Sequence, residues 1–220
     1  MPLQNRVDPY GNIFRSPARG TFMGNRGGAL HNGQREIVRP YKDRRWIACV
    51  LEFRGRKRSV MTPNRYTELF FLDEAVAFSA GHRPCFECRR KRFLAFQDAW
   101  QRARQQSEPP RAMEMDAELH CARIQGRAAK VTYQAPLDSL PNGTFIELAP
   151  AALQSRDREG AVAAPCLIWN DAVYLWTPQR YTQKRTRPRG ISVTVLTPRP
   201  IVECFRAGYI PEIHSSFGTL

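Results

Sequence analysis

Two cysteines separated by two residues are the part of this sequence best suited to chemistry. Cys85 and Cys88 form a C-x-x-C pair, and Pro84 stiffens the chain just before it. Basic residues follow directly: Arg89, Arg90, Lys91 and Arg92. Thiolates at this spacing are typical of half a zinc site, and the basic residues behind them favour contact with phosphate. Redox motifs share the spacing, so the zinc interpretation depends on further ligands.

The remaining ligands of a tetrahedral zinc site must come from elsewhere in the chain. Cys49 lies in an apolar run upstream of the pair and is the third ligand that we expect. The alternative for Cys49 is a small buried side chain on a core strand. A neutral histidine, either His31 or His120, would be the fourth ligand of a structural zinc ion. The other cysteines lack partner spacing and are expected in the core: Cys121, Cys166 and Cys204.

Positive charge dominates the composition. The chain has 220 residues, with 34 Lys and Arg against 20 Asp and Glu, and a formal net charge of +14. This excess favours a polyanionic partner, for which we expect nucleic acid, DNA in preference to RNA. An anionic membrane surface is the alternative, but no apolar run approaches the roughly 20 residues of a spanning helix, so no membrane partner is expected. Scattered cysteines and an N-terminus without a secretion signal predict a cytoplasmic protein with reduced thiols.

The basic residues gather in clusters that we expect to contact a nucleic-acid backbone. The first cluster surrounds a predicted hairpin, the second follows the C-x-x-C pair, and the third lies in a predicted loop over residues 180–189. The expected phosphate contacts are Arg44, Arg45, Arg54, Arg56, Lys57, Arg58, Arg89, Arg90, Arg92, Lys184 and Arg185.

Short strands and helices are expected to position these residues. The β-branched and aromatic run 46–53 predicts a strand that returns over 58–61 as a hairpin with a basic tip. Asp73 begins a short helix that ends at Gly81. A longer helix is expected from Cys85 to about Gln105. Further elements are expected at 113–123 (helix) and at 130–133, 144–148, 172–176 and 192–196 (strands).

These elements predict an α+β fold. We expect residues 1–34 to be a flexible basic arm, because Gly, Arg and Asn dominate them. Residues 35–108 would form a metal-binding region of a hairpin and two helices, ending where Pro109 and Pro110 break the chain. Residues 109–220 would form a β-rich region that packs against it as one compact unit.

A group of polar residues supports a second interpretation, an enzyme that acts on nucleic acid as a nuclease or in repair. Asp116 and His120 lie four residues apart on the predicted helix and would form an oriented base. Arg123 would hold a phosphate, and Glu68 would be a second carboxylate. The structural alternative is an ordinary surface pair, and the chain carries no deaminase, H-E-x-x-H or P-loop signature. A third interpretation is a metal-free structural or interaction protein.

The run Ala80-Gly81-His82-Arg83-Pro84-Cys85-x-x-Cys88 also resembles a known zinc site. With Phe70-Phe71 and Glu74-Ala75 before it, residues 70–92 resemble the second half of the zinc-binding N-terminal domain of the bacterial Ada DNA alkylation-repair family. In that family the run is typically A-G-F-R-P-C-x-x-C. The resemblance implies a small sheet against helices, zinc on four thiolates, and a basic face on the DNA backbone, in a repair or defence context.

The chain departs from that family at the second thiol pair. The family carries a further C-x-x-x-C pair, one thiolate of which accepts a methyl group from a DNA phosphotriester. Here the corresponding positions fall near Arg54 and Arg58, so the resemblance does not imply methyl transfer by that route. The whole chain is also similar to a family of uncharacterised bacterial proteins, through residues 66–75 and Gly208-Tyr209-Ile210-Pro211-x-x-His214, which implies no activity.

Overall fold

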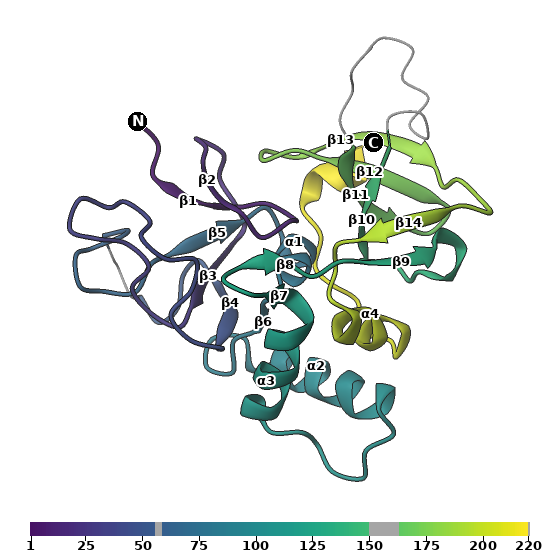
Figure 1. The fold of residues 1–220 in the computed structure, drawn as a ribbon, viewed down its shortest axis with the longest axis horizontal. Helices are drawn as coiled ribbons and strands as arrows, with labels where there is room; N and C mark the ends of the chain where they lie inside the picture. Colours follow the sequence, from purple (N-terminus) through teal and green to yellow (C-terminus); the bar gives the residue numbers. More distant parts are fainter. Residues whose placement is uncertain (56–58, 150–162, 220) are drawn as a thin grey trace.

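Two antiparallel-rich β-sheets lie side by side in the computed structural model, which describes residues 1–55, 59–149 and 163–219 (Figure 1). The strand order of the first sheet is β2 (Ile13–Arg15), β1 (Gln4–Val7), β5 (Leu69–Phe71), β3 (Phe22–Arg26), β4 (Trp46–Val50) and β6 (Arg83–Pro84). The strand order of the second sheet is β13 (Tyr181–Thr186), β12 (Ala172–Trp176), β11 (Ala164–Trp169), β10 (Phe145–Leu148), β14 (Ser192–Val195) and β9 (Tyr133–Pro136). A hairpin joins β7 (Ile124–Gln125) to β8 (Ala129–Lys130).

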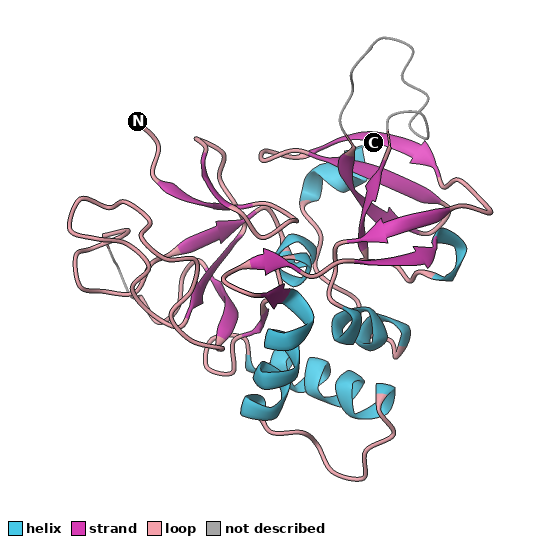
Figure 2. Cartoon of the chain, in the orientation of Figure 1, coloured by secondary structure: helices cyan, strands magenta, loops and turns pink. Residues whose placement is uncertain are grey.

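Helices fill the space between the two sheets and below them (Figure 2). They are α1 (Glu74–Ser79), α2 (Arg90–Ala103), α3 (Ala112–Arg123) and α4 (Arg199–Arg206), with 3₁₀ turns η1 (Leu137–Ser139) and η3 (Ser215–Thr219). Helix α1 contacts β3 and β5 of the first sheet and β10 of the second, and α4 packs on α2 and α3. The predicted α+β class is confirmed. In the described part of the chain, no helix is long and apolar enough to cross a membrane.

The first residues of the chain are part of the first sheet. Strands β1, β2 and β3 all lie within residues 1–34, and Val7 and Phe22 are buried in its core. The expectation of a flexible arm is therefore corrected: alternate residues of β1 and β3 are buried, among them the apolar Val7 and Phe22.

The expected hairpin after β4 is also corrected. Strand β4 pairs antiparallel with β3, from Phe22↔Val50 to Arg26↔Trp46, and parallel with β6. Residues 59–61 form no strand, and the expected tip residues Arg56, Lys57 and Arg58 lie outside the described residues. Because β3 and β6 occupy both edges of β4, no edge remains for a return strand.

Local signals place α1 as predicted. The Asp73 carboxylate accepts a hydrogen bond from the Val76 amide at 2.9 Å and caps the first turn. Gly81 adopts a φ of +85° after the last turn, where its amide bonds to the Phe78 carbonyl and the next amide, of His82, to the Ala77 carbonyl. A positive φ favours glycine, so the sequence signal and the observed helix end agree.

Helix α2 begins five residues later than predicted. Residues 85–89 form a turn in which the Arg89 amide bonds to the Cys85 carbonyl at 3.1 Å, and regular helix starts at Arg90. The predicted apolar face is confirmed, since Phe93, Phe96 and Trp100 are all at most 2% exposed.

The second half of the chain is β-rich, with differences from the predicted boundaries. Helix α3 and strands β10, β12 and β14 lie where predicted, whereas β11 and α4 were not predicted. The basic stretch expected as a loop over 180–189 is largely strand β13. One hydrophobic cluster contains side chains of both sheets, such as Phe71 and Phe145, so the sheets share a core.

Candidate metal centre

Three cysteine side chains meet at the β6 end of the first sheet. Cys49 lies on β4, and Cys85 and Cys88 lie in the turn between β6 and α2. Strand β6 pairs parallel with β4 at Ala48↔Pro84, and the Cys85 amide donates to the Ala48 carbonyl at 2.9 Å. This pairing brings Cys85 level with Cys49. The three Sγ atoms all lie within 4.8 Å of one another.

The three thiols could hold a metal ion. Zinc–sulfur bonds of about 2.3 Å put neighbouring sulfurs of a tetrahedral site about 3.8 Å apart, so a small contraction of this group would suffice. The thiols of Cys49 and Cys88 hydrogen-bond to the Cys85 sulfur and lower the pKa of Cys85 far below its usual value. The hydrogen bond to Cys85 raises the pKa of Cys49. Negative charge is therefore already favoured at one sulfur of the group, and metals bind the thiolate form.

The cysteines form part of the wall of a cavity of about 780 Å³. Apolar side chains from β3, β4, β5 and the loop after β4 line much of it, together with three carboxylates. The lining includes Arg45, Glu52, Phe53, Glu68, Phe70 and Phe86. A ligand in this cavity would lie against the sulfurs on one side and aromatic rings on the other.

Neither histidine proposed as the fourth ligand reaches the cysteines. Among the residues that the structure describes, Cys49, Cys85 and Cys88 are joined by no other histidine, cysteine or carboxylate at the same mutual distance. The ring nitrogens of His31 lie 2.6 Å from the Thr67 hydroxyl and 3.1 Å from the Thr62 carbonyl. His120 packs on the Tyr41 ring, 5.2 Å between centroids. The assignment of either as a ligand is corrected, because other partners hold both rings.

The proposed catalytic residues lie in two separate places. Asp116 is buried, and both its oxygens accept from Arg83, at 2.8 and 2.7 Å. His120 shares a shallow pocket of about 620 Å³ with Asp116, but the contact of its Nδ1 is with Arg123, at 3.3 Å. The structure therefore gives Asp116 the role of an ion-pair partner to Arg83.

Glu68 lies on the cavity of the three cysteines. It is 3% exposed, and its Oε2 accepts a hydrogen bond from the Met61 amide at 2.8 Å. The residue predicted as a second carboxylate thus shares a cavity with the candidate metal centre, while Asp116, His120 and Arg123 do not line it.

Two of the predicted phosphate contacts are engaged inside the protein. Arg89 is 5% exposed and pairs with Glu74 at 2.8 Å, and Arg92 pairs with the same carboxylate at 2.6 Å. A second carboxylate, Glu212, lies 3.3 Å from Arg89. The assignment of Arg89 to phosphate contact is corrected, because its guanidinium is buried and paired.

Other predicted basic residues are exposed, and some of them surround the cavity. Arg54 lies over the Phe53 ring at 5.0 Å, and Arg90 over the Phe86 ring at 4.5 Å. Arg45 lines the cavity and pairs with Asp43. Arg44 is exposed nearby, whereas Lys184 and Arg185 are exposed on β13 of the second sheet.

The aromatic residues at the cavity rim were not predicted as functional. Phe86, inside the C-x-x-C pair, is 49% exposed. A large apolar side chain inside the C-x-x-C pair is the sequence signal that could have found this rim. No protein-family model, curated protein or solved structure matches this chain, so the similarity of residues 70–92 to the Ada family stays a prediction.

Proposed function

We propose that this chain is a zinc-containing protein that binds nucleic acid, with DNA as the preferred partner, at the rim of the cysteine cavity. The observation that carries this proposal is the meeting of three Sγ atoms within 4.8 Å on the wall of a 780 Å³ cavity. Arginine–aromatic pairs surround that cavity. The cysteine group, the arginines and the aromatic rings would together form one surface with positive charge and exposed rings, which suits a nucleic acid better than a neutral partner.

Zinc is the metal that this donor set favours. Soft thiolates select Zn, Cu(I) or iron–sulfur clusters, and most clusters take four cysteines. Zinc accepts three protein ligands and leaves its remaining position to water or to another ligand. Cys49, Cys85 and Cys88 would hold the ion, which would fix β4, the turn before α2 and β6 relative to one another.

The rim supports binding of unpaired nucleotides. Arginine binds phosphate, and exposed rings such as Phe86 stack on bases whatever their sequence, at about 1–3 kcal/mol per base. Arg54 lies over the Phe53 ring and Arg90 over the Phe86 ring, so a guanidinium and an aromatic ring lie together at two points of the rim. Single-stranded or locally opened DNA fits this alternation better than a continuous duplex.

Binding of labelled oligonucleotides tests this function. We expect the double variant Arg54→Ser/Arg90→Ser to weaken single-stranded DNA binding and to lower the slope of log K against log salt by about 1.4, roughly 0.7 for each lost phosphate contact. The matched control is Arg206→Ser, which removes an exposed arginine from α4. Binding that does not depend on salt, or equal losses in the control, would remove the proposal.

Catalysis at the metal is a second candidate, favoured by the three-ligand geometry and by Glu68. A zinc ion with an open position supplies Lewis-acid chemistry. Glu68 is the buried carboxylate of the same cavity and would move a proton there. In a panel of labelled DNA and RNA oligonucleotides, we expect cleavage or base release that is lost in Glu68→Gln. Equal product formation by the wild type and Glu68→Gln would contradict that role.

A further inference from the structure

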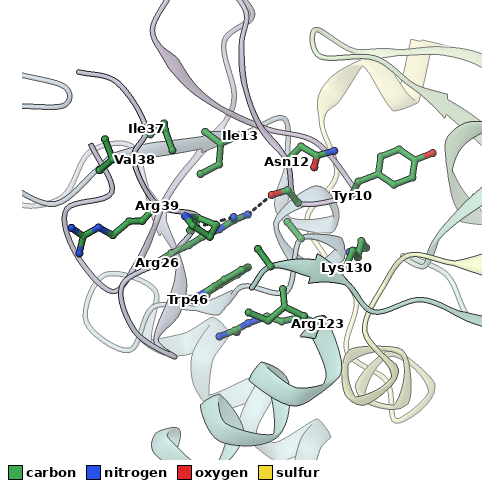
Figure 3. A pocket seen from close by; sticks show the side chains of 15 residues that line it. Tyr10, Asn12, Ile13, Arg26, Ile37, Val38, Arg39, Trp46, Arg123 and Lys130 are labelled. Atoms are coloured by element: carbon green, nitrogen blue, oxygen red, sulfur yellow. Dashed lines mark hydrogen bonds between the residues drawn. The ribbon is translucent and has the colours of Figure 1, made fainter. Parts of the chain in front are cut away.

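A second cavity, away from the cysteines, has buried cations on its wall. It has a volume of about 540 Å³ and lies between the first sheet and the β7–β8 hairpin (Figure 3). Arg26 from β3, Arg123 from the end of α3 and Lys130 from β8 all line it. Arg26 is 2% exposed and Arg123 is 1% exposed, whereas Lys130 is half-buried.

Elsewhere the fold pairs its buried arginines with carboxylates. Arg83 has Asp116 at 2.7 Å, and Arg89 has Glu74 at 2.8 Å. By contrast, within residues 1–55, 59–149 and 163–219 no carboxylate forms a salt bridge with Arg26, Arg123 or Lys130. Burying a charge without an opposite charge is costly, so this cluster calls for an explanation.

The contacts of the three cations are with neutral groups. Arg26 donates to the carbonyl of Gly11 at 2.9 Å, and Lys130 donates to that of Ser79 at 2.6 Å. Arg123 donates to the carbonyl of Gly81 at 2.9 Å and to that of Arg44 at 2.7 Å. These bonds fix the positions of the cations and leave their charge uncompensated. The buried Nε of Arg123 has no hydrogen-bond partner among the described residues.

Trp46 holds the two arginines apart and in place. The guanidinium carbons of Arg26 and Arg123 both lie 4.0 Å from its ring centroid. Figure 3 shows Trp46 between the two arginines, with Lys130 beyond it and Ile13, Ile37 and Val38 on the other side of the cavity. The cavity therefore has one cationic wall, built on a rigid ring, and a second wall of apolar side chains next to which the exposed Arg39 also lines the cavity.

The protonation of the cluster fits a missing anion. Burial lowers the pKa of Arg26 to about 9, that of Arg123 to about 9 and that of Lys130 to about 7. The carboxylate of Asp8 is near enough to raise the pKa values of Arg26 and Lys130, but it is hydrogen-bonded to Asn12. None of the described residues that line the cavity is a carboxylate, so its basic lining favours an anion such as a phosphomonoester, which carries a charge of about −1.5 to −2 at neutral pH.

We propose that this cavity binds the phosphate group of a phosphomonoester, held by Arg26, Arg123 and Lys130, with the apolar part of the ester against Ile13, Ile37 and Val38. Guanidinium groups match phosphate oxygens in bidentate contacts, and lysine adds a point charge. This site shares no lining residue with the cysteine cavity, so it does not rest on the metal centre. The phosphate could belong to a small molecule or to the end of a nucleic acid.

Calorimetric titration of the full chain tests the proposal, with inorganic phosphate, phenyl phosphate and benzoate as probes. We expect phenyl phosphate to bind at least 10-fold more tightly than benzoate, and more tightly than inorganic phosphate. We expect Lys130→Gln to weaken phenyl phosphate binding by roughly 10-fold, because it removes one charged contact with the phosphate. Ala128→Glu, at an exposed position of the lining, adds a carboxylate without removing a buried group and should abolish binding.

The control variant is Arg206→Gln, which removes one exposed positive charge from α4, outside the cavity lining, and should bind phenyl phosphate as the wild type does. No binding of phosphate compounds by the wild type, equal binding of benzoate, or undiminished binding in a folded Ala128→Glu variant would overturn the proposal. A 5′-phosphorylated oligonucleotide that binds more tightly than its unphosphorylated copy assigns the phosphate to a nucleic-acid end. Equal binding of the two oligonucleotides, with tight phenyl phosphate binding, assigns it to a small molecule.

Discussion

Cys49 decides what the C-x-x-C pair can do. Two thiolates alone leave half of a tetrahedral site unfilled, and Cys49 is the described donor that comes within 4.8 Å of both Cys85 and Cys88. Its position on β4 means that metal binding would join a strand to a turn far from it in sequence. The metal would then contribute to folding as well as to the site, because its binding free energy counts as folding free energy.

We predict that Cys49→Ser lowers zinc affinity by roughly 100-fold or more. Loss of a residue that only hydrogen-bonds to a metal ligand already costs about 10- to 100-fold, and loss of a ligand itself should cost at least as much. Chelator competition with a colorimetric zinc indicator measures the affinity. Cys121→Ser is the matched control: the expectation that Cys121 lies in the core is wrong, since it is exposed on α3 and outside the cysteine group. Equal zinc affinities of the two variants would contradict the ligand assignment.

Lys130 should make stability depend on pH. Burial lowers its pKa from 10.5 to about 7 in the folded protein. Between about pH 7 and 10.5 the unfolded chain therefore binds more protons, and the free energy of unfolding rises with pH. The groups that act on Lys130 are Asp8, which favours its charge, and Arg26, which opposes it.

We predict that the rise in unfolding free energy from pH 7 to pH 8.5 is smaller in Lys130→Met than in the wild type by roughly 1–2 kcal/mol. Urea denaturation at the two pH values, without phosphate in the buffer, measures it. An identical pH dependence of the two proteins would contradict a lowered pKa of Lys130 in the folded protein.

At the scale of elements, α1 is the helix to which the rest of the helical layer is attached. Its Glu74 is 1% exposed and receives Arg89, Arg92, the Tyr209 hydroxyl at 2.7 Å and the Glu212 amide at 2.8 Å. One carboxylate thus joins α1 to α2 and to the segment after α4. This network also keeps the turn of Cys85 and Cys88 against the sheet, because Arg89 ends that turn.

We predict that Glu74→Ala lowers the free energy of unfolding by about 3–5 kcal/mol, because it leaves Arg89 buried without its counter-charge. Asp98→Ala breaks the exposed pair with Arg102 and should cost less than about 1 kcal/mol. Denaturant unfolding of both variants compares them. A loss below about 1 kcal/mol in Glu74→Ala would mean that the buried pair contributes no more than a surface pair.

Helix ends and the buried faces of helices could be predicted from the sequence, because they depend on residues close to one another in the chain. Asp73 and Gly81 mark the ends of α1, and the aromatic spacing marks the buried face of α2. The partner of β4 was not predictable in the same way, because β3 lies in a Gly- and Arg-rich segment that reads as a loop. Cys49 was found through its residue type. The cavities and the Arg26–Trp46–Arg123 stack were not, since their residues come from distant parts of the chain.

At the scale of the whole molecule, the basic residues behind the net charge of +14 fall into two groups, those paired inside the protein and those exposed on its surface. Some arginines, such as Arg83 and Arg89, serve internal pairs, whereas others lie exposed at the rim of the cysteine cavity or on β13. Only the exposed ones can release counterions from a nucleic acid. The number of phosphate contacts should therefore be well below the number of basic residues.

We predict that Lys184→Gln/Arg185→Gln lowers the slope of log K against log salt for DNA binding by roughly 1–2. This effect requires a DNA strand long enough to reach from the cavity rim to the second sheet. Fluorescence anisotropy with oligonucleotides of increasing length measures it. A decrease confined to long oligonucleotides is the expected result. An unchanged slope at every length would restrict the nucleic-acid surface to the first sheet.

The metal centre is tested most directly by X-ray absorption at the zinc edge, on protein purified without chelator. The proposed zinc centre predicts about one zinc per chain, with three sulfur neighbours at about 2.3 Å and one oxygen or nitrogen neighbour at about 2.0 Å. Addition of a small thiol that fits the cavity should replace the light neighbour with a fourth sulfur. Protein that holds no zinc, or zinc without three sulfur neighbours, would contradict a centre built from Cys49, Cys85 and Cys88.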